Sequence, residues 1–258
     1  FFFGGNYSKS GVGADGEGAM SPSVSTVSEG AVAEASSDGA IAETPSGAAI
    51  TSSGAAITSP DAVSTIISPD AVSTASERYS EAKGMAINPG TGKDKYLTDP
   101  VPEGKPIPVE PENATVTDRK LSCTLSVRCD TVLNNMKDLD PEKIELVPED
   151  GVIFAETKVT FYEGESVFNV LLREMKKNKI HMEFVNTPIY NSAYIEGINN
   201  LYEFDCGELS GWMYKVNGWF PNYGCSRYQL KDGDVVEWVY TCDLGRDVGG
   251  YYSAGGTR

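Results

Sequence analysis

The large apolar residues of this chain are concentrated in its second half, and this uneven distribution limits what the chain can fold into. Of the 37 Trp, Tyr, Phe and Leu residues, 30 lie after Lys120, whereas residues 10–83 consist mostly of Ser, Ala, Gly, Thr and Val. A stable core needs many large side chains, because burial of apolar surface is the main favourable term in folding. The sequence therefore predicts one ordinary domain, built from roughly the last 140 residues.

The densest aromatic segment runs from Gly211 to Asp243 and holds all three tryptophans. Alternating bulky residues predict a strand that ends at an Asn217-Gly218 turn, and Val235 to Tyr240 predicts a second strand after Asp232-Gly233. The loop between these strands is apolar, so we expect a ligand, another chain or the protein core to pack against it. The candidate ligand-binding or interface residues are Trp212, Tyr214, Trp219, Phe220, Tyr223 and Tyr228.

Residues 121–204 carry the patterns of a small α+β domain, in which a mixed sheet wraps one amphipathic helix. Residues 121–129 alternate between apolar and polar side chains, as expected for a half-buried strand. A helix is predicted to start at Glu165-Ser166 and to end at residues 176–179, where lysines suit a helix C-terminus. Further strand-like runs cover residues 153–162, 180–184, 194–198 and 202–204.

A short repeat precedes this domain. Gly47-Ala-Ala-Ile-Thr-Ser-Ser is followed by Gly54-Ala-Ala-Ile-Thr-Ser-Pro, and then by related units that begin at Asp61 and Asp70. Its composition favours a flexible stalk, because so few large side chains cannot offset the entropy of ordering. The alternative is an extended or β-strand-rich ladder that stacks on itself or on a neighbouring chain. Candidate assembly residues are Phe1, Phe2, Phe3, Ile50, Ile57, Val63, Ile66 and Val72.

These composition shifts predict four parts. A low-complexity repeat region at 1–84 is followed by a Pro/Gly-rich linker at 85–118, a domain at 119–250 and a tail at 251–258. The linker is predicted because closely spaced prolines favour an extended, semi-rigid backbone.

The charge and the cysteines indicate an extracellular or cell-surface protein. A net charge of −16 argues against nucleic acid or an anionic membrane as a partner. No run approaches the roughly 20 apolar residues of a membrane span. The five cysteines lack CxxC spacing, which disfavours zinc, and their odd number allows at most two disulfides whose pairing the sequence does not reveal. The disulfide candidates are Cys123, Cys129, Cys206, Cys225 and Cys242.

Several motifs, taken in order, resemble the transcobalamin-like C-terminal domain of bacterial secreted proteins. They are Thr160 to Phe168 (TFYEGESVF), Tyr194 to Ile198 (YIEGI), Gly211 to Gly218 (GWMYKVNG), and Tyr228 to Asp234 (YQLKDGD) followed by Glu237-Trp238. The likeness covers roughly residues 121–250. It implies a β-grasp-like fold, a secreted location and kinship with the corrinoid-capping domain of cobalamin carriers.

Enzymatic chemistry is not indicated by the sequence. The single histidine, His181, lies on an expected strand, and a Cys-His nucleophile would need a reactive thiolate beside it. The Lys231-Asp232-Gly233-Asp234 turn lacks the spaced ligands of a calcium loop. We expect no catalytic residue, no metal ligand and no cofactor.

Two non-enzymatic functions remain. The first is a subunit of a bacterial surface filament or appendage, a homopolymer in which an extended segment of one subunit adds a strand to the sheet of the next. The alternative is a secreted or cell-surface binding protein for cobalamin or another corrinoid, with the repeat region as a flexible stalk and the aromatic loop stacked on the planar ligand.

Overall fold

The computed structural model describes residues 69–250, with side chains from residue 75 onward, and begins with a helix. Helix α1 (Pro69–Ala82) contains the last copy of the repeat, which was expected to be extended or strand-rich. Ala, Ser and Glu in this unit are compatible with a helix, and Pro at its first position presets the backbone angle there. The strand prediction is therefore wrong for this copy. Phe1, Phe2, Phe3, Ile50, Ile57, Val63 and Ile66 lie outside the described residues, as does the side chain of Val72.

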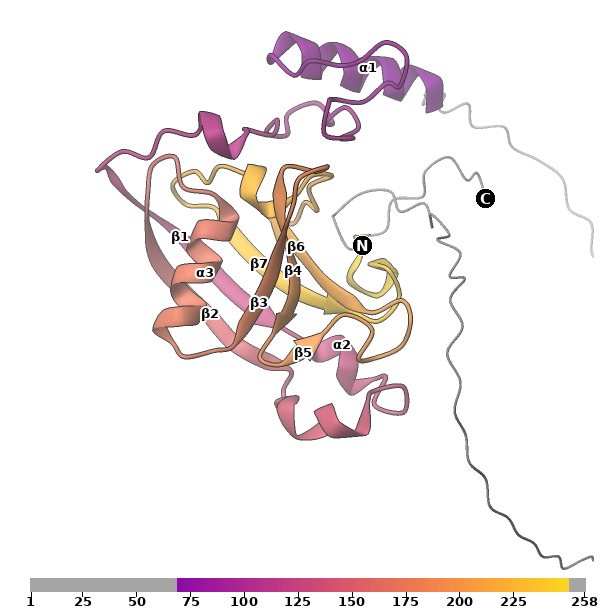
Figure 1. Ribbon diagram of the computed structural model, residues 1–258, viewed down its shortest axis with the longest axis vertical. Coiled ribbons are helices and arrows are strands. Elements are labelled where there is room, and N and C mark those ends of the chain that lie inside the picture. The colour runs from indigo at the N-terminus through magenta and orange to yellow at the C-terminus, as the bar shows by residue number, and fades with distance from the viewer. Residues whose placement is uncertain (1–68, 251–258) are drawn as a thin grey trace, which may run out of the picture. The chain divides into compact units, whose positions relative to one another are not determined.

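Four strands form the main sheet, in the order β2-β1-β7-β6 (Figure 1). They are β1 (Lys120–Arg128), β2 (Val152–Tyr162), β6 (Gly211–Val216) and β7 (Val235–Thr241). Strand β1 pairs parallel with β7, whereas β2 and β6 pair antiparallel on the two flanks. A central parallel pair with antiparallel flanks is the β-grasp arrangement, so the predicted α+β class and mixed sheet are confirmed.

A helix and a smaller antiparallel sheet complete the domain. Helix α3 (Val167–Lys177) begins at Ser166, whose hydroxyl accepts the backbone N–H of Asn169 in a capping box. The second sheet has the order β3-β4-β5, with β3 (Met182–Thr187), β4 (Ser192–Ile198) and β5 (Leu201–Tyr202). The remaining helices are α2 (Asp130–Leu133) and the 3₁₀ turns Pro111–Asn113, Pro141–Leu146, Cys225–Arg227 and Arg246–Val248.

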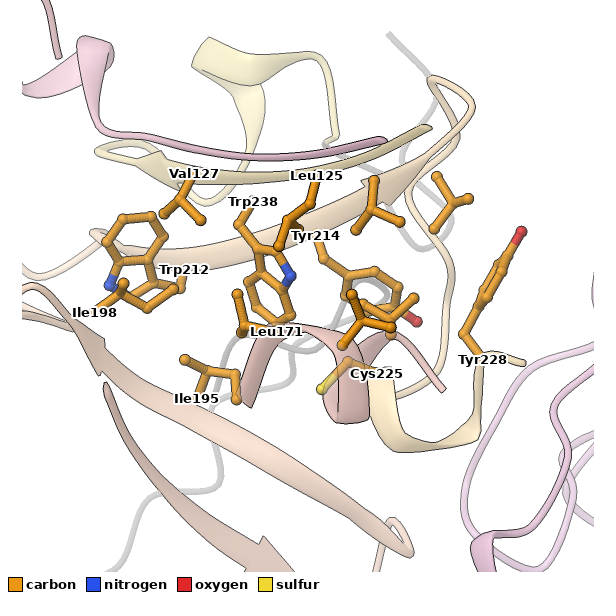
Figure 2. Packing of buried hydrophobic residues seen from close by; sticks show 14 of the residues in the cluster. Leu125, Val127, Leu171, Ile195, Ile198, Trp212, Tyr214, Cys225, Tyr228 and Trp238 are labelled. Carbon is orange, nitrogen blue, oxygen red and sulfur yellow. The ribbon is translucent and has the colours of Figure 1, made fainter. Parts of the chain in front are cut away.

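One apolar core joins the two sheets and α3. Buried residues of α3 recur every three or four positions, as in Val167, Val170, Leu171 and Met175, so one face of this helix packs inward. Figure 2 shows the rings of Trp212, Trp238 and Tyr214 between Leu125 and Val127 on one side and Leu171 and Ile195 on the other.

The Pro/Gly-rich segment at 85–118 packs on the domain instead of standing apart from it. Met85 and Val101 are buried in the same core as the sheets, and Ile107 packs against that core. The Val101 amide donates a 2.8 Å hydrogen bond to the Ser80 hydroxyl, which ties the segment to α1. Proline spacing predicts an extended backbone, but it does not reveal what such a backbone packs against.

Within residues 69–250, no helix combines the length and the apolar character needed to cross a membrane.

Candidate functional site

The structure places all six aromatic candidates in the core. Trp219 is the most exposed of them, at 8%. The Trp212 indole N–H donates to the Leu201 carbonyl at 2.8 Å, and the Tyr214 hydroxyl donates to the Tyr223 carbonyl at 2.7 Å. These rings pack on one another and on the sheet, because large aromatic side chains contribute the most area to a core. They do not form an open platform for a planar ligand.

All five cysteines are free thiols in this structure. Burial raises the pKa of all five thiols above the ordinary value, to about 12 for Cys123, Cys129 and Cys225, so all five are poor nucleophiles near neutral pH. The remaining two are neighbours, with 3.5 Å between the Sγ atoms of Cys206 and Cys242.

A groove of about 530 Å³ lies at a place that the aromatic pattern did not indicate. It is lined by residues from four segments, 111–116, 164–169, 186–193 and 226–229, which surround the start of α3 and the turn between β3 and β4. Val116, Phe168 and Pro188 supply apolar surface. We call it the amide groove, because four residues with amide side chains are among those that line it, Asn169, Asn186, Asn191 and Gln229.

The polar groups of the amide groove are neutral. None of the described residues that line it is charged. The side chains of Asn186 and Gln229 make no hydrogen bond to another described residue, so their donors and acceptors are available to a ligand. Asn191 donates to the Glu110 and Glu112 carboxylates at 2.7 and 2.9 Å, and its bond lowers the pKa of Glu112.

Two of the lining residues also hold local structure. The Asn169 side-chain oxygen accepts the backbone N–H and the hydroxyl of Ser166, at 2.9 and 2.8 Å, which fixes the start of α3. Ser226 joins the loop that precedes β7 to the start of β4, because its hydroxyl accepts the Ala193 amide at 3.0 Å. The groove is therefore built on anchored backbone, which suits a preformed binding site.

Arg227 anchors the 85–118 segment, which contributes residues 111–116 to the amide groove. This residue is 1% exposed, and its guanidinium donates to the carboxylates of Asp94 and Glu110 at 2.6 and 2.7 Å and to the Thr98 hydroxyl at 2.6 Å. Its carbonyl accepts the Val109 amide at 2.9 Å. Residues 111–116 follow directly, so Arg227 positions one wall of the amide groove.

Sequence reasoning did not select the amide groove or Arg227. The four amides are spread over 61 positions, from Asn169 to Gln229, and match no spacing motif. The available signal was the segment 186–192, which spans the turn between two strands and contains Asn186, Asn191 and Ser192.

The described part of the chain gives little support to metal binding, to histidine chemistry or to a calcium-binding turn. Residues 69–250 contain no group of three His, Cys, Asp or Glu side chains that could hold a metal ion. His181 is exposed, with its ring centroid 6.0 Å from that of Tyr202. At the 231–234 turn, an Asp234 carboxylate oxygen accepts the Lys231 amide at 2.8 Å, as in an ordinary turn.

Comparison with known families bears on the domain directly. Residues 164–242 match the model of a family described as a domain of unknown function, DUF4430, which is transcobalamin-like. Residues 164–242 form a DUF4430 domain. The family that the sequence motifs resemble is thereby confirmed. The DUF4430 match includes three of the four segments that line the amide groove, namely 164–169, 186–193 and 226–229.

Two solved structures are similar to this chain at low identity. Haptocorrin in complex with Cbi is 16% identical, with a TM-score of 0.37, over 57% of this chain and 29% of the haptocorrin chain. A protein from Ruminococcus gnavus ATCC 29149, described as "a putative metal binding protein", is 16% identical, with a TM-score of 0.29, over 47% of this chain and 96% of its own. The present chain thus matches less than a third of haptocorrin. No curated protein matches it.

Proposed function

We propose that this protein is an extracellular ligand-binding protein whose amide groove binds one edge of a corrinoid. The observation that carries the proposal is a groove lined by four Asn and Gln residues and by no charged residue. A corrin ring bears carboxamide side chains around its edge. An amide both donates and accepts hydrogen bonds, so amide pairs form without the cost of burying a charge. The transcobalamin-like character of residues 164–242 supports the same ligand class.

The size of the groove sets how the ligand would bind. A volume of about 530 Å³ lies within the usual range for small-molecule sites. A corrin ring is too wide to enter completely, so an edge with its amides would enter while the rest of the ring stays outside. The apolar surface of Phe168, Pro188 and Val116 would contact the aliphatic part of that edge. Partial burial predicts modest affinity, with a Kd on the order of micromolar.

Titration calorimetry with cobinamide and with cobalamin tests the proposal. The double variant Asn186→Ala with Gln229→Ala removes two amides that make no hydrogen bond to another described residue, so the fold should be retained. Its Kd should rise at least about tenfold, because two hydrogen bonds to the ligand are lost.

The matched control is Asn134→Ala, which removes an exposed amide that does not line the groove. This variant should bind as the unaltered chain does. No binding of either corrinoid at about 1 mM, a concentration far above a micromolar Kd, would reject the proposal. Equal affinities of the double variant and the control would show that binding occurs elsewhere.

The filament interpretation receives no support from the described residues. Most of its assembly candidates lie before residue 69. The repeat copy that begins at Asp70, which the structure describes, is helical. It stays a prediction that electron microscopy can check. Polymers of the full chain that disappear when residues 1–68 are deleted would support it, and a chain that never polymerises would contradict it.

A further inference from the structure

Cys206 and Cys242 face each other across two segments that the core brings together. Cys206 lies in the loop after β5, and Cys242 directly follows β7. Their Sγ atoms are 3.5 Å apart, although the residues are 36 positions apart in the sequence. Both backbones are anchored. The Cys206 amide donates to the Ser210 hydroxyl at 3.0 Å, and the Cys242 amide donates to the Asp247 carboxylate at 2.7 Å.

Among the described residues, the structure gives the other three cysteines no sulfur–sulfur contact. Cys123 lies on β1 and Cys129 directly follows it, so six strand positions separate them by about 20 Å, far beyond the reach of a disulfide. Cys225 is buried, and its thiol donates to the Ala193 carbonyl at 3.5 Å. An odd cysteine count is therefore compatible with one bonded pair and three buried thiols.

We propose that Cys206 and Cys242 form a disulfide bond when the protein meets a disulfide oxidant, as extracellular proteins do. A bonded pair has an S–S distance of about 2.05 Å, so the sulfurs must approach by about 1.5 Å. Rotation about the two Cα–Cβ bonds supplies a movement of this size without displacing the anchored backbones.

The exchange balances with oxidised glutathione as the oxidant. Cys242 is the partly exposed member, so it is the one that glutathione reaches. Burial raises its pKa, so a small thiolate fraction attacks one glutathione sulfur and releases the first glutathione thiolate. The buried Cys206 then attacks the Cys242 sulfur of this mixed disulfide and releases the second glutathione. The protein loses two protons and two electrons, and one oxidised glutathione becomes two reduced molecules.

The bond would close a loop that contains β6, the aromatic loop and β7. Such a closure restricts the unfolded chain, and the effect grows with the length of the loop. It would also hold the end of β7 against the loop after β5. The segment with all three tryptophans would then be covalently closed at both ends.

Peptide mapping of the full chain tests this pairing without any variant. The lysines and arginines place each cysteine on a different tryptic peptide, with Cys206 on 180–215 and Cys242 on 232–246. After incubation with oxidised glutathione, blocking with iodoacetamide and digestion, these two peptides should appear joined. The other three cysteines should become alkylated only when the protein is unfolded before blocking. Joined peptides of any other pair, or none, would overturn the proposal.

Thermal unfolding provides the second measurement. The oxidised chain should melt at least about 5 °C above the same chain in dithiothreitol. In Cys242→Ser the two conditions should give the same Tm, because no bond can form. If the two peptides are joined but the Tm of the oxidised chain does not rise, the bond forms but does not stabilise the fold. A Tm difference that persists in Cys242→Ser would assign the stabilisation to another thiol.

Discussion

Trp212 and Trp238 are equally buried but differ in one hydrogen bond. The Trp212 indole N–H donates to the Leu201 carbonyl, whereas the Trp238 indole N–H has no partner among the described residues. Trp212→Phe leaves a buried carbonyl without that donor, and Trp238→Phe removes an unpaired donor. We therefore expect Trp212→Phe to lower the free energy of unfolding by about 1–2 kcal/mol more than Trp238→Phe does. Urea denaturation measures both, and equal losses would contradict the expectation.

The buried thiols should make the fold sensitive to alkaline pH. Cys123, Cys129 and Cys225 have pKa values near 12 in the folded chain, against an ordinary value of 9.0. Below pH 9 the thiols are protonated in both states, so their contribution to stability is complete. As the pH rises from 9 toward 12, the unfolded chain releases protons that the folded chain retains. The free energy of unfolding should then fall by about 1.4 kcal/mol per pH unit for each thiol.

Urea denaturation at pH 8 and pH 10.5 checks this alkaline loss. Buried tyrosines such as Tyr228, whose pKa burial also raises, act in the same direction at higher pH. The matched control is Cys129→Ala, which should lose less stability between the two pH values than the unaltered chain, because one thiol is gone. A pH dependence that is the same in both proteins would argue against a role for Cys129.

The alternation of bulky residues correctly indicated that Trp212, Tyr214 and Val216 share one face, and all three are buried in one core. The same pattern could not distinguish a core from a ligand surface, because both use large aromatic side chains. That choice depends on what covers the strand. The cover comes from β4 and α3, which are remote in sequence.

At the scale of elements, Arg227 is the clearest attachment of the 85–118 segment. Its guanidinium is buried with Asp94 and Glu110, and removal of one partner from a buried ion pair leaves an uncompensated charge. We expect Arg227→Gln to lower the free energy of unfolding by about 3–5 kcal/mol. Hydrogen exchange should also show faster exchange at the Val109 amide, whose acceptor is the Arg227 carbonyl.

Arg119→Gln provides the control for this prediction. Arg119 forms an exposed ion pair with Glu163 at 3.0 Å, so its loss should cost less than about 1 kcal/mol. Unchanged exchange at Val109 in Arg227→Gln would show that the segment is held by its apolar contacts alone. If the wall of the amide groove depends on Arg227, the same variant should also weaken corrinoid binding.

The sequence predicts elements whose signals lie within a few residues of one another. It does not predict contacts between residues that are far apart in the chain. The predicted helix start at Glu165-Ser166 agrees with α3, because capping and amphipathic spacing lie within a few residues. By contrast, Asp94 and Arg227 are 133 positions apart, and neither belongs to a motif that marks the other as its partner. The amide groove could not be predicted for the same reason, since its four walls are remote in sequence.

At the scale of the whole molecule, buried contacts cross the predicted boundary at residue 119. Residues 69–250 belong to one compact unit, to which the segment before residue 119 contributes the buried side chains of Met85 and Val101. That segment also supplies both carboxylates that pair with Arg227. A fragment of residues 119–250 would expose apolar core surface and leave a buried arginine unpaired, and each change is destabilising.

We therefore expect residues 69–250 to form a cooperatively folding protein and residues 119–250 to be far less stable. Loss of the buried pair alone should remove about 3–5 kcal/mol, a large part of the stability of a typical domain. Urea denaturation of the two fragments compares their midpoints directly. A third fragment, residues 85–250, separates the contribution of α1 from that of the segment. Equal midpoints for 69–250 and 119–250 would show that the sheets and α3 fold independently, and the segment would then be a linker that merely rests on them.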